Sequence, residues 1–170
     1  LVVSSEIVAK VLIDKQSPFL RSIIINKGSK DNIKLGMAVL DDEYLVGKVI
    51  EVNYTTSRVL LLSDLNSKIP VGLEPNNIQS ILSGTGKRNG KIEYVESEIL
   101  IDDGSIVYTS GSGNIFKSGI PIGIFNKNEN FNRDRKNQFY LHASPSQSAV
   151  RCASVALNCW PNNFVIVALQ

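Results

Sequence analysis

The sequence has little of what catalytic and metal sites require. It contains one histidine, His142, and two cysteines, Cys152 and Cys159, in 170 residues. These side chains do not supply the set of nitrogen and sulfur ligands that a structural zinc site needs, so we expect no metal and no cofactor. The Cys-x6-Cys spacing leaves two alternatives open, a disulfide that closes a short loop or two unpaired, buried thiols.

A strong net charge and a long apolar run are also missing. Eighteen basic and 16 acidic residues leave a formal net charge of +2, which gives little long-range attraction to nucleic acid or to an anionic membrane. The longest apolar stretch near either end is Phe164 to Leu169, whereas a membrane-spanning helix needs about 20 residues. We therefore expect no nucleic-acid binding and no membrane span within this chain.

What the sequence does contain is a series of short β-strands, clearest between Arg21 and Val52. Three consecutive isoleucines open it, the turn residues of Gly28 to Asn32 interrupt it, and apolar runs return at Met37 to Leu40 and at Tyr44 to Val52. β-Branched runs separated by Gly, Ser, Asp and Asn are typical of strands and turns. Because short strands of this kind continue along the chain without a helical period, the sequence predicts an all-β fold of barrels or a sandwich.

The same pattern returns later in the chain. Ile33, Gly36 and Val39 are repeated 68 residues on as Ile101, Gly104 and Val107, and Val46-Gly47 is repeated 76 residues on as Ile122-Gly123. The eight extra positions fall in the glycine-rich stretch TSGSGNIFKSG. A shared order of turn, strand and glycine-bearing strand predicts two similar β modules in tandem.

The polar turn Glu74-Pro75-Asn76-Asn77 is the best candidate for the boundary between the modules. We expect a first β-barrel module at residues 1–76, a second at 77–158, and a divergent C-terminal tail at 159–170 that is poorly packed or attached as an extra strand. Pro70 should hold its strand to a sheet edge or a bulge, because proline donates no ladder hydrogen bond.

Two stretches suggest chemistry that their spacing does not support. The residue types of a serine-hydrolase triad are present as Ser112, Asp102, Asp103 and His142. However, the acids precede the serine and the histidine follows it, and this order fits neither common triad arrangement. The glycine-rich segment from Gly84 to Lys91, GTGKRNGK, lacks the glycine spacing and the hydroxyl residue of a phosphate-binding loop. Its pattern is typical of a hairpin. A serine hydrolase, or small-ligand binding on a two-barrel fold, is kept as the alternative function.

Four sequence segments resemble those of a known protein family. They are SPFLRSIIINKGSKDNIKLGMAVLDDEYLVGKVIEV, TSRVLLLSDLNSKIPV, ILSGTG and TSGSGNIFKSGIPIG. In this order and spacing the chain resembles, over about residues 6–125, the periplasmic β-domain of the MreC family of bacterial rod-shape-determining proteins. The resemblance implies two small β-barrels in a chymotrypsin-like arrangement without a catalytic triad. After about Gly123 the sequence departs from the family pattern.

The resemblance also implies a function. It is that of a non-enzymatic scaffold of the cell-wall elongation machinery, which maintains rod shape during peptidoglycan synthesis. The implied partners are MreD, the actin-like MreB, a class B penicillin-binding transpeptidase and further copies of the same protein, as a dimer or filament. The implied location is the periplasmic side of the inner membrane, reached through an N-terminal anchor outside this chain.

A scaffold needs exposed contacts, and we take Ile115, Phe116 and Tyr94 as candidate partner-binding residues. Ile115 and Phe116 lie in the eight-residue insertion between glycine-rich segments. Large apolar residues in such a loop either fill the core of their own module or bind a partner. For Phe116 we favour the core, because a buried phenylalanine is the commoner outcome.

Overall fold

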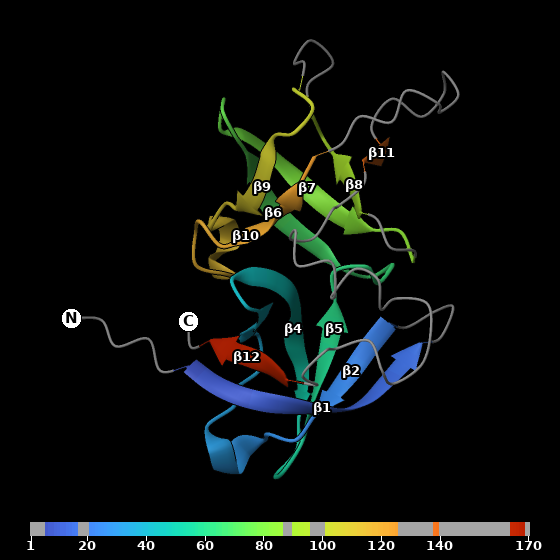
Figure 1. Ribbon diagram of the computed structural model, residues 1–170, viewed down its shortest axis with the longest axis vertical. Helices are drawn as coiled ribbons and strands as arrows, with labels where there is room; N and C mark the ends of the chain where they lie inside the picture. Colours follow the sequence, from blue (N-terminus) through green and yellow to red (C-terminus); the bar gives the residue numbers. More distant parts are fainter. Residues whose placement is uncertain are drawn as a thin grey trace, which may run out of the picture.

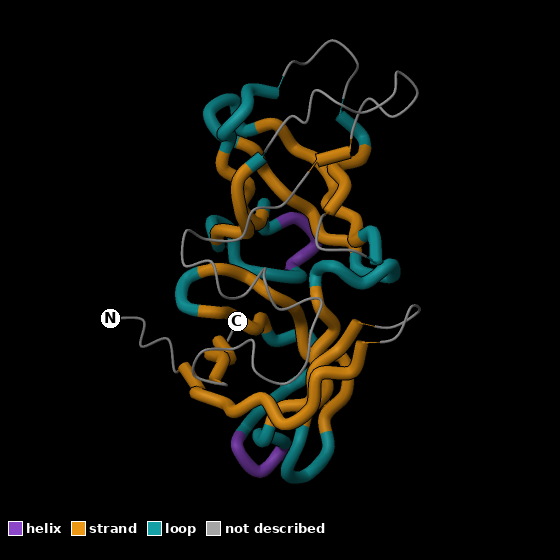
Figure 2. Tube along the Cα trace, turned by 45° about the vertical axis from the view of Figure 1, so that its right-hand side comes forward, coloured by secondary structure: helices purple, strands orange, loops and turns teal. Residues whose placement is uncertain are grey.

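The computed structural model describes residues 6–16, 21–86, 90–95, 101–125, 138–139 and 164–168. Within these ranges the regular structure is β-strand, apart from the short 3-10 helices η1 and η2 (Figure 2). The elements are β1 Glu6–Gln16, β2 Arg21–Ile25, η1 Ser29–Asp31, β3 Ala38–Asp41, β4 Tyr44–Val52, β5 Ser57–Leu61, β6 Lys68–Leu73, β7 Ile78–Gly84, β8 Gly90–Glu93, β9 Ile106–Thr109, η2 Ser112–Asn114, β10 Pro121–Ile124, β11 Gln138–Phe139 and β12 Phe164–Ala168. The predicted all-β class is confirmed.

The strands form two lobes that are stacked along the long axis of the molecule (Figure 1). The first lobe is a closed barrel with the strand order β1-β12-β3-β4-β5-β2. The second lobe is a curled sheet with the order β10-β9-β6-β7-β8-β11, which stays open as a half-barrel. The predicted pair of β-barrels is therefore present, with one barrel closed and the other curled but not closed.

Each lobe has an apolar core, and one of the cores continues across the junction between them. The barrel is filled by buried aliphatic side chains that include Ile23, Ile25, Val39, Val59 and Val167. The core of the second sheet also takes in two buried residues of the first lobe, Ala38 and Leu45, and Leu62, which follows β5. The lobes thus share apolar contacts and are not joined by a linker alone.

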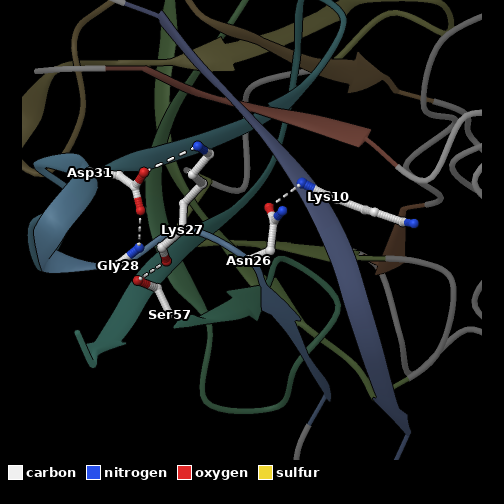
Figure 3. A network of polar contacts seen from close by, with 6 residues as sticks. All are labelled: Lys10, Asn26, Lys27, Gly28, Asp31 and Ser57. Carbon is white, nitrogen blue, oxygen red and sulfur yellow. Dashed lines mark hydrogen bonds and ion pairs between the residues drawn. The ribbon is translucent and has the colours of Figure 1, made fainter. Parts of the chain in front are cut away.

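The turn that contains η1 is held by polar contacts (Figure 3). The carboxylate of Asp31 accepts hydrogen bonds from the Gly28 N–H at 3.2 Å and from the Lys27 ammonium at 3.1 Å. The Gly28 N–H, followed by Lys27, lowers the pKa of Asp31 below its ordinary value. The Ser57 hydroxyl, from β5, donates to the Lys27 carbonyl at 2.7 Å. These bonds fasten the end of β2 to its neighbour in the barrel.

The sequence repeat is also a repeat of backbone hydrogen bonds. In the barrel, Gly36 donates its N–H to the carbonyl of Val49, and the Val49 N–H donates to the carbonyl of Met37. In the second sheet, Gly104 donates its N–H to the carbonyl of Phe125, and the Phe125 N–H donates to the carbonyl of Ser105. The strand pairs that follow correspond as well, with Val39 opposite Gly47 and Val107 opposite Gly123. Two similar β units, each a turn followed by an antiparallel strand pair, therefore lie in the two lobes.

Two strands pair with strands that are distant from them in the sequence. β6 falls before residue 76, yet it pairs with β7 and β9 of the second sheet. β12 falls in the expected tail, yet it lies between β1 and β3 and closes the barrel. Val165 and Val167 of this strand are 2% and 0% exposed, so of the two alternatives expected for the tail, poor packing or an extra strand, β12 agrees with the strand. The apolar run in the tail therefore contributes Val165 and Val167 to the core of the barrel. The module limits at residues 76 and 158 stay predictions.

Pro70 lies in a central strand, which corrects the expectation of an edge or a bulge. Its strand, β6, has a neighbour on each side. The Pro70 carbonyl accepts from the Ser110 N–H at 3.1 Å, and the nitrogen and carbonyl of one strand residue point to the same side. The missing N–H therefore faces Ser110, the residue after Thr109, which is the last β9 residue paired with β6. The proline thus stands at the end of the β6–β9 pairing.

Candidate interaction surface

The predicted insertion loop folds back onto the second sheet. Thr109 is 0% exposed, and its hydroxyl donates to the Lys117 carbonyl at 2.6 Å and accepts from the Ile120 N–H at 2.9 Å. Gly111 and Gly119 hold φ angles of +78° and +87°, which glycine adopts without the steric cost of a side chain. The threonine and the glycines together close the loop around η2.

The two apolar residues of this loop point into the protein. Phe116 is 5% exposed and belongs to the apolar core of the second sheet, and Ile115 is partly buried against the same core. Phe116 therefore lies where the core alternative places it, and it is not an exposed anchor for a partner. Tyr94 is different, because 74% of it is exposed directly after β8. The structure does not bring the three predicted residues together into one surface.

An exposed apolar patch lies instead on the outer face of β9 and β10. Ile106 and Ile124 stand opposite each other on these strands and are 47% and 38% exposed. Tyr108 and Pro121 also stand opposite each other on these strands, beyond the pair of Val107 and Gly123. We call these four residues the β9–β10 patch. Single exposed apolar residues are common on proteins, whereas adjacent ones are a feature of interaction sites.

Tyr108 is held in place within the patch. Its hydroxyl donates to the side-chain oxygen of Asn77 at 2.8 Å. Its ring covers Gly72 of β6 so closely that a Cβ atom there would lie 2.8 Å from the ring. The hydrogen bond to Asn77 and the contact with Gly72 together hold the Tyr108 ring in one position. The patch is therefore preorganised, which lowers the entropy cost of binding a partner.

Charged side chains lie on the other side of the same outer face. Glu93 of β8 accepts from the Ser83 hydroxyl at 2.9 Å and from the Lys91 ammonium at 3.2 Å, and Lys68 lies 3.8 Å away. The Ser83 hydroxyl and then Lys91 lower the pKa of Glu93. The outer face therefore has an apolar side and a charged side, a combination also found in protein interfaces with an apolar centre and a polar rim.

Sequence reasoning missed Ile106 and Ile124. The strand pairing shifts between Pro121 and Gly123, and this bulge turns Ile122 into the core while Ile124 faces out. Simple alternation places Ile122 and Ile124 on one face, so it hides the exposed residue. The isoleucines on adjoining strands were visible in the sequence, but their register was not.

The residues that suggested a serine hydrolase are not assembled in the described part of the chain. Asp102 and Asp103 precede β9, and Ser112 follows its other end, in η2. The Asp102 carbonyl accepts from the Ser105 hydroxyl at 2.7 Å as part of a turn. His142 and both cysteines lie outside the described residues. No group of acidic, histidine or cysteine side chains that could hold a metal ion occurs among the described residues.

The sequence of this chain matches known proteins of one family. A family model described as rod shape-determining protein MreC, barrel core, matches residues 11–157. The cell shape-determining protein MreC of Haemophilus influenzae is 32% identical over 160 residues, which cover 94% of this chain and 45% of that protein. The protein of the same name from Cereibacter sphaeroides is 38% identical over 113 residues, covering 66% and 38%. The chain spans less than half the length of these relatives.

Solved structures share the fold. The crystal structure of MreC from Pseudomonas aeruginosa aligns with a TM-score of 0.76 at 25% identity, covering 97% of this chain and 99% of that one. The MreC chain in a complex with penicillin-binding protein PBP2 from Helicobacter pylori aligns at 0.67 with 13% identity, covering 98% of each. A major periplasmic domain from the cell shape-determining filament MreC aligns at 0.72 with 19% identity, covering 97% and 95%. In the part of this chain that the structure describes, no helix has the length and apolar character to cross a membrane.

Proposed function

This chain belongs to the MreC family of rod shape-determining proteins, and on that premise we propose that it is a non-enzymatic scaffold of the bacterial cell-wall elongation machinery. In this role it binds partner proteins and holds them in place during peptidoglycan synthesis. The observation that carries the proposal is the family match over residues 11–157. The separation of Ser112 from Asp102 and Asp103 along β9 agrees with a role without hydrolysis.

The partner that we propose first is a class B penicillin-binding transpeptidase. An MreC protein with the same fold has been solved in complex with PBP2, which supports this class of partner. Self-association is proposed because a protein of this fold is described as a filament. MreD and the actin-like MreB are proposed from family membership alone. The periplasmic side of the inner membrane is the proposed location, since a neighbouring structure is described as a periplasmic domain.

We place the transpeptidase contact on the β9–β10 patch. Ile106 and Ile124 are exposed and adjacent, and the fixed ring of Tyr108 continues their surface. Apolar and aromatic side chains of this kind carry much of the energy of protein interfaces. Of the predicted residues, Tyr94 remains a proposed contact because it is exposed, whereas Ile115 and Phe116 act through the core of the sheet.

The test is a binding measurement between the purified chain and the class B transpeptidase of the same organism. The substitution Ile106→Asp places a charge in the patch without touching the core, and binding should weaken by at least about tenfold, as loss of a strong interface contact does. Leu35→Asp is the matched control, because Leu35 is 67% exposed in the first lobe. Equal affinity of the wild type and Ile106→Asp would remove the patch from the proposal. Absence of any binding by the wild-type chain would count against the transpeptidase itself.

A further inference from the structure

The loop that links the lobes is tied to both of them. Residues 62–67, which we call the junction loop, connect β5 of the barrel to β6 of the second sheet. In Figure 1 the chain passes at this point from the lower lobe to the upper one. Loops between lobes are commonly exposed and mobile, but Leu62, Asp64 and Ser67 are 8%, 1% and 3% exposed. The burial of half of this loop indicates a structural role.

Asp64 fastens the loop to the barrel. One carboxylate oxygen accepts from the Arg21 N–H, at the start of β2, at 2.5 Å. The other accepts from the backbone and side-chain amides of Asn66 at 2.8 and 3.0 Å. A buried carboxylate needs such donors to replace its lost hydration, and hydrogen bonds to a charged group are stronger than neutral ones. The Asp64 side chain therefore fixes both the shape of the loop and its position on β2.

Glycines fasten the same loop to the second sheet. The Gly84 N–H, at the end of β7, donates to the Ser67 carbonyl at 3.0 Å, and the Gly86 N–H donates to the Ser63 carbonyl at 2.8 Å. A Cβ atom on Gly84 would lie 1.9 Å from the backbone oxygen of Asp64. Since only glycine leaves room for this contact, the sheet and the loop touch backbone to backbone.

We infer that Asp64 is a positioning residue that sets the orientation of the barrel relative to the second sheet. The Asp64 carboxylate binds the junction loop to the barrel. Gly84 of the second sheet contacts the backbone of the same loop. The shared apolar residues Ala38, Leu45 and Leu62 resist separation of the lobes, but apolar contact is non-directional. The directional bonds of Asp64 select one orientation among those that apolar contact would allow.

The substitution Asp64→Asn tests this inference with little change of shape. Both carboxylate oxygens accept hydrogen bonds, so an asparagine in either amide orientation turns its NH2 group towards an N–H donor. The experiment places spin labels at Val8→Cys on β1 and Ile106→Cys on β9, both exposed, in a chain in which Cys152 and Cys159 are replaced by serine. The distance distribution between the labels then reports the orientation of the lobes.

We expect a broader or shifted distribution in Asp64→Asn than in the wild type. Asp31→Asn is the matched control, because Asp31 accepts hydrogen bonds from Gly28 and Lys27 within the barrel alone; its distribution should match the wild type even if stability falls. A wild-type distribution in Asp64→Asn overturns the inference, and so does equal broadening in Asp31→Asn. Should Asp64→Asn fail to fold, Asn66→Ala decides alone, since it removes the side-chain donor to Asp64. A broadened distribution then supports the inference, and an unchanged one overturns it.

Discussion

Gly36 and Gly104 have the same backbone conformation in the two lobes. Both hold a φ of +86°. Each donates its N–H to the carbonyl of a residue whose own N–H donates to the residue after the glycine. Apart from the glycine and its two chain neighbours, no heavy atom lies within 4 Å of the Cβ position at either site. Space is therefore available at both positions, and the backbone angle alone favours glycine.

We predict that Gly36→Ala and Gly104→Ala destabilise the protein by similar amounts, about 1–2 kcal/mol, which is the cost of a left-handed conformation for an L-residue. Urea unfolding of the two variants measures it. Asparagine tolerates this region better than alanine, so Gly36→Asn and Gly104→Asn should cost less. A negligible loss of stability at either site in the alanine variants would contradict the equivalence of the two turns.

Truncation of β12 is predicted to open the barrel. Val167 is fully buried between β1 and β3, so Val167→Ala should lower the free energy of unfolding by about 2 kcal/mol for the lost methyl groups and the cavity. Ile166→Ala, on the outward face of the same strand, is the control and should cost less.

Removal of residues 164–170 should abolish cooperative unfolding in urea. A truncated chain as stable as the intact one would show that the barrel closes without this strand.

Phe116→Ala is predicted to lower the free energy of unfolding by about 3–5 kcal/mol, as truncation of a buried aromatic residue does. The reason is that Phe116 is 5% exposed in the core shared by the lobes. Tyr94→Ala removes a side chain that is 74% exposed and should change stability by no more than about 0.5 kcal/mol. Equal effects of the two substitutions in chemical denaturation would contradict the assignment of Phe116 to the core.

Glu93 is predicted to make stability depend on acid pH. Its pKa is lowered in the folded protein from 4.5 by the Ser83 hydroxyl and then by Lys91. The unfolded chain therefore binds the proton more readily, so Glu93 stabilises the fold above about pH 4.5 and this contribution is lost as the pH falls through the folded-state pKa. Glu93→Gln should lose less stability between about pH 7 and about pH 3 than the wild type. Urea midpoints across this range measure it, with the exposed Glu74→Gln as the control.

The sequence predicted local features better than the pairing of distant strands. The Ile-rich strand at Ile23, the turn after Gly28 and the interior Gly47 could be read because each depends on neighbouring residues. Gly47 indeed lies where a Cβ atom would come 2.3 Å from the Leu60 carbonyl oxygen. The place of β12 could not be read, since an apolar run carries no information about which strands it joins.

The same limit applies to the interaction surface. Phe116 was expected in the core from residue type alone, and it lies there. The exposure of Ile124 depends on a bulge in the pairing of β10 with β9, and the role of Asp64 depends on a donor, Arg21, from another strand. Both are properties of register and packing, which single residues in a sequence do not reveal.

The position of β12 between β1 and β3 also determines the order in which the chain can fold as it is made. The barrel begins with the first described strand but lacks one strand of its wall until β12, the last described strand, has been synthesised. Until then β1 and β3 have edges without their final partner, whereas strands β6 to β10 are complete in the sequence that precedes it. The second lobe can therefore assemble first, and the first lobe closes last.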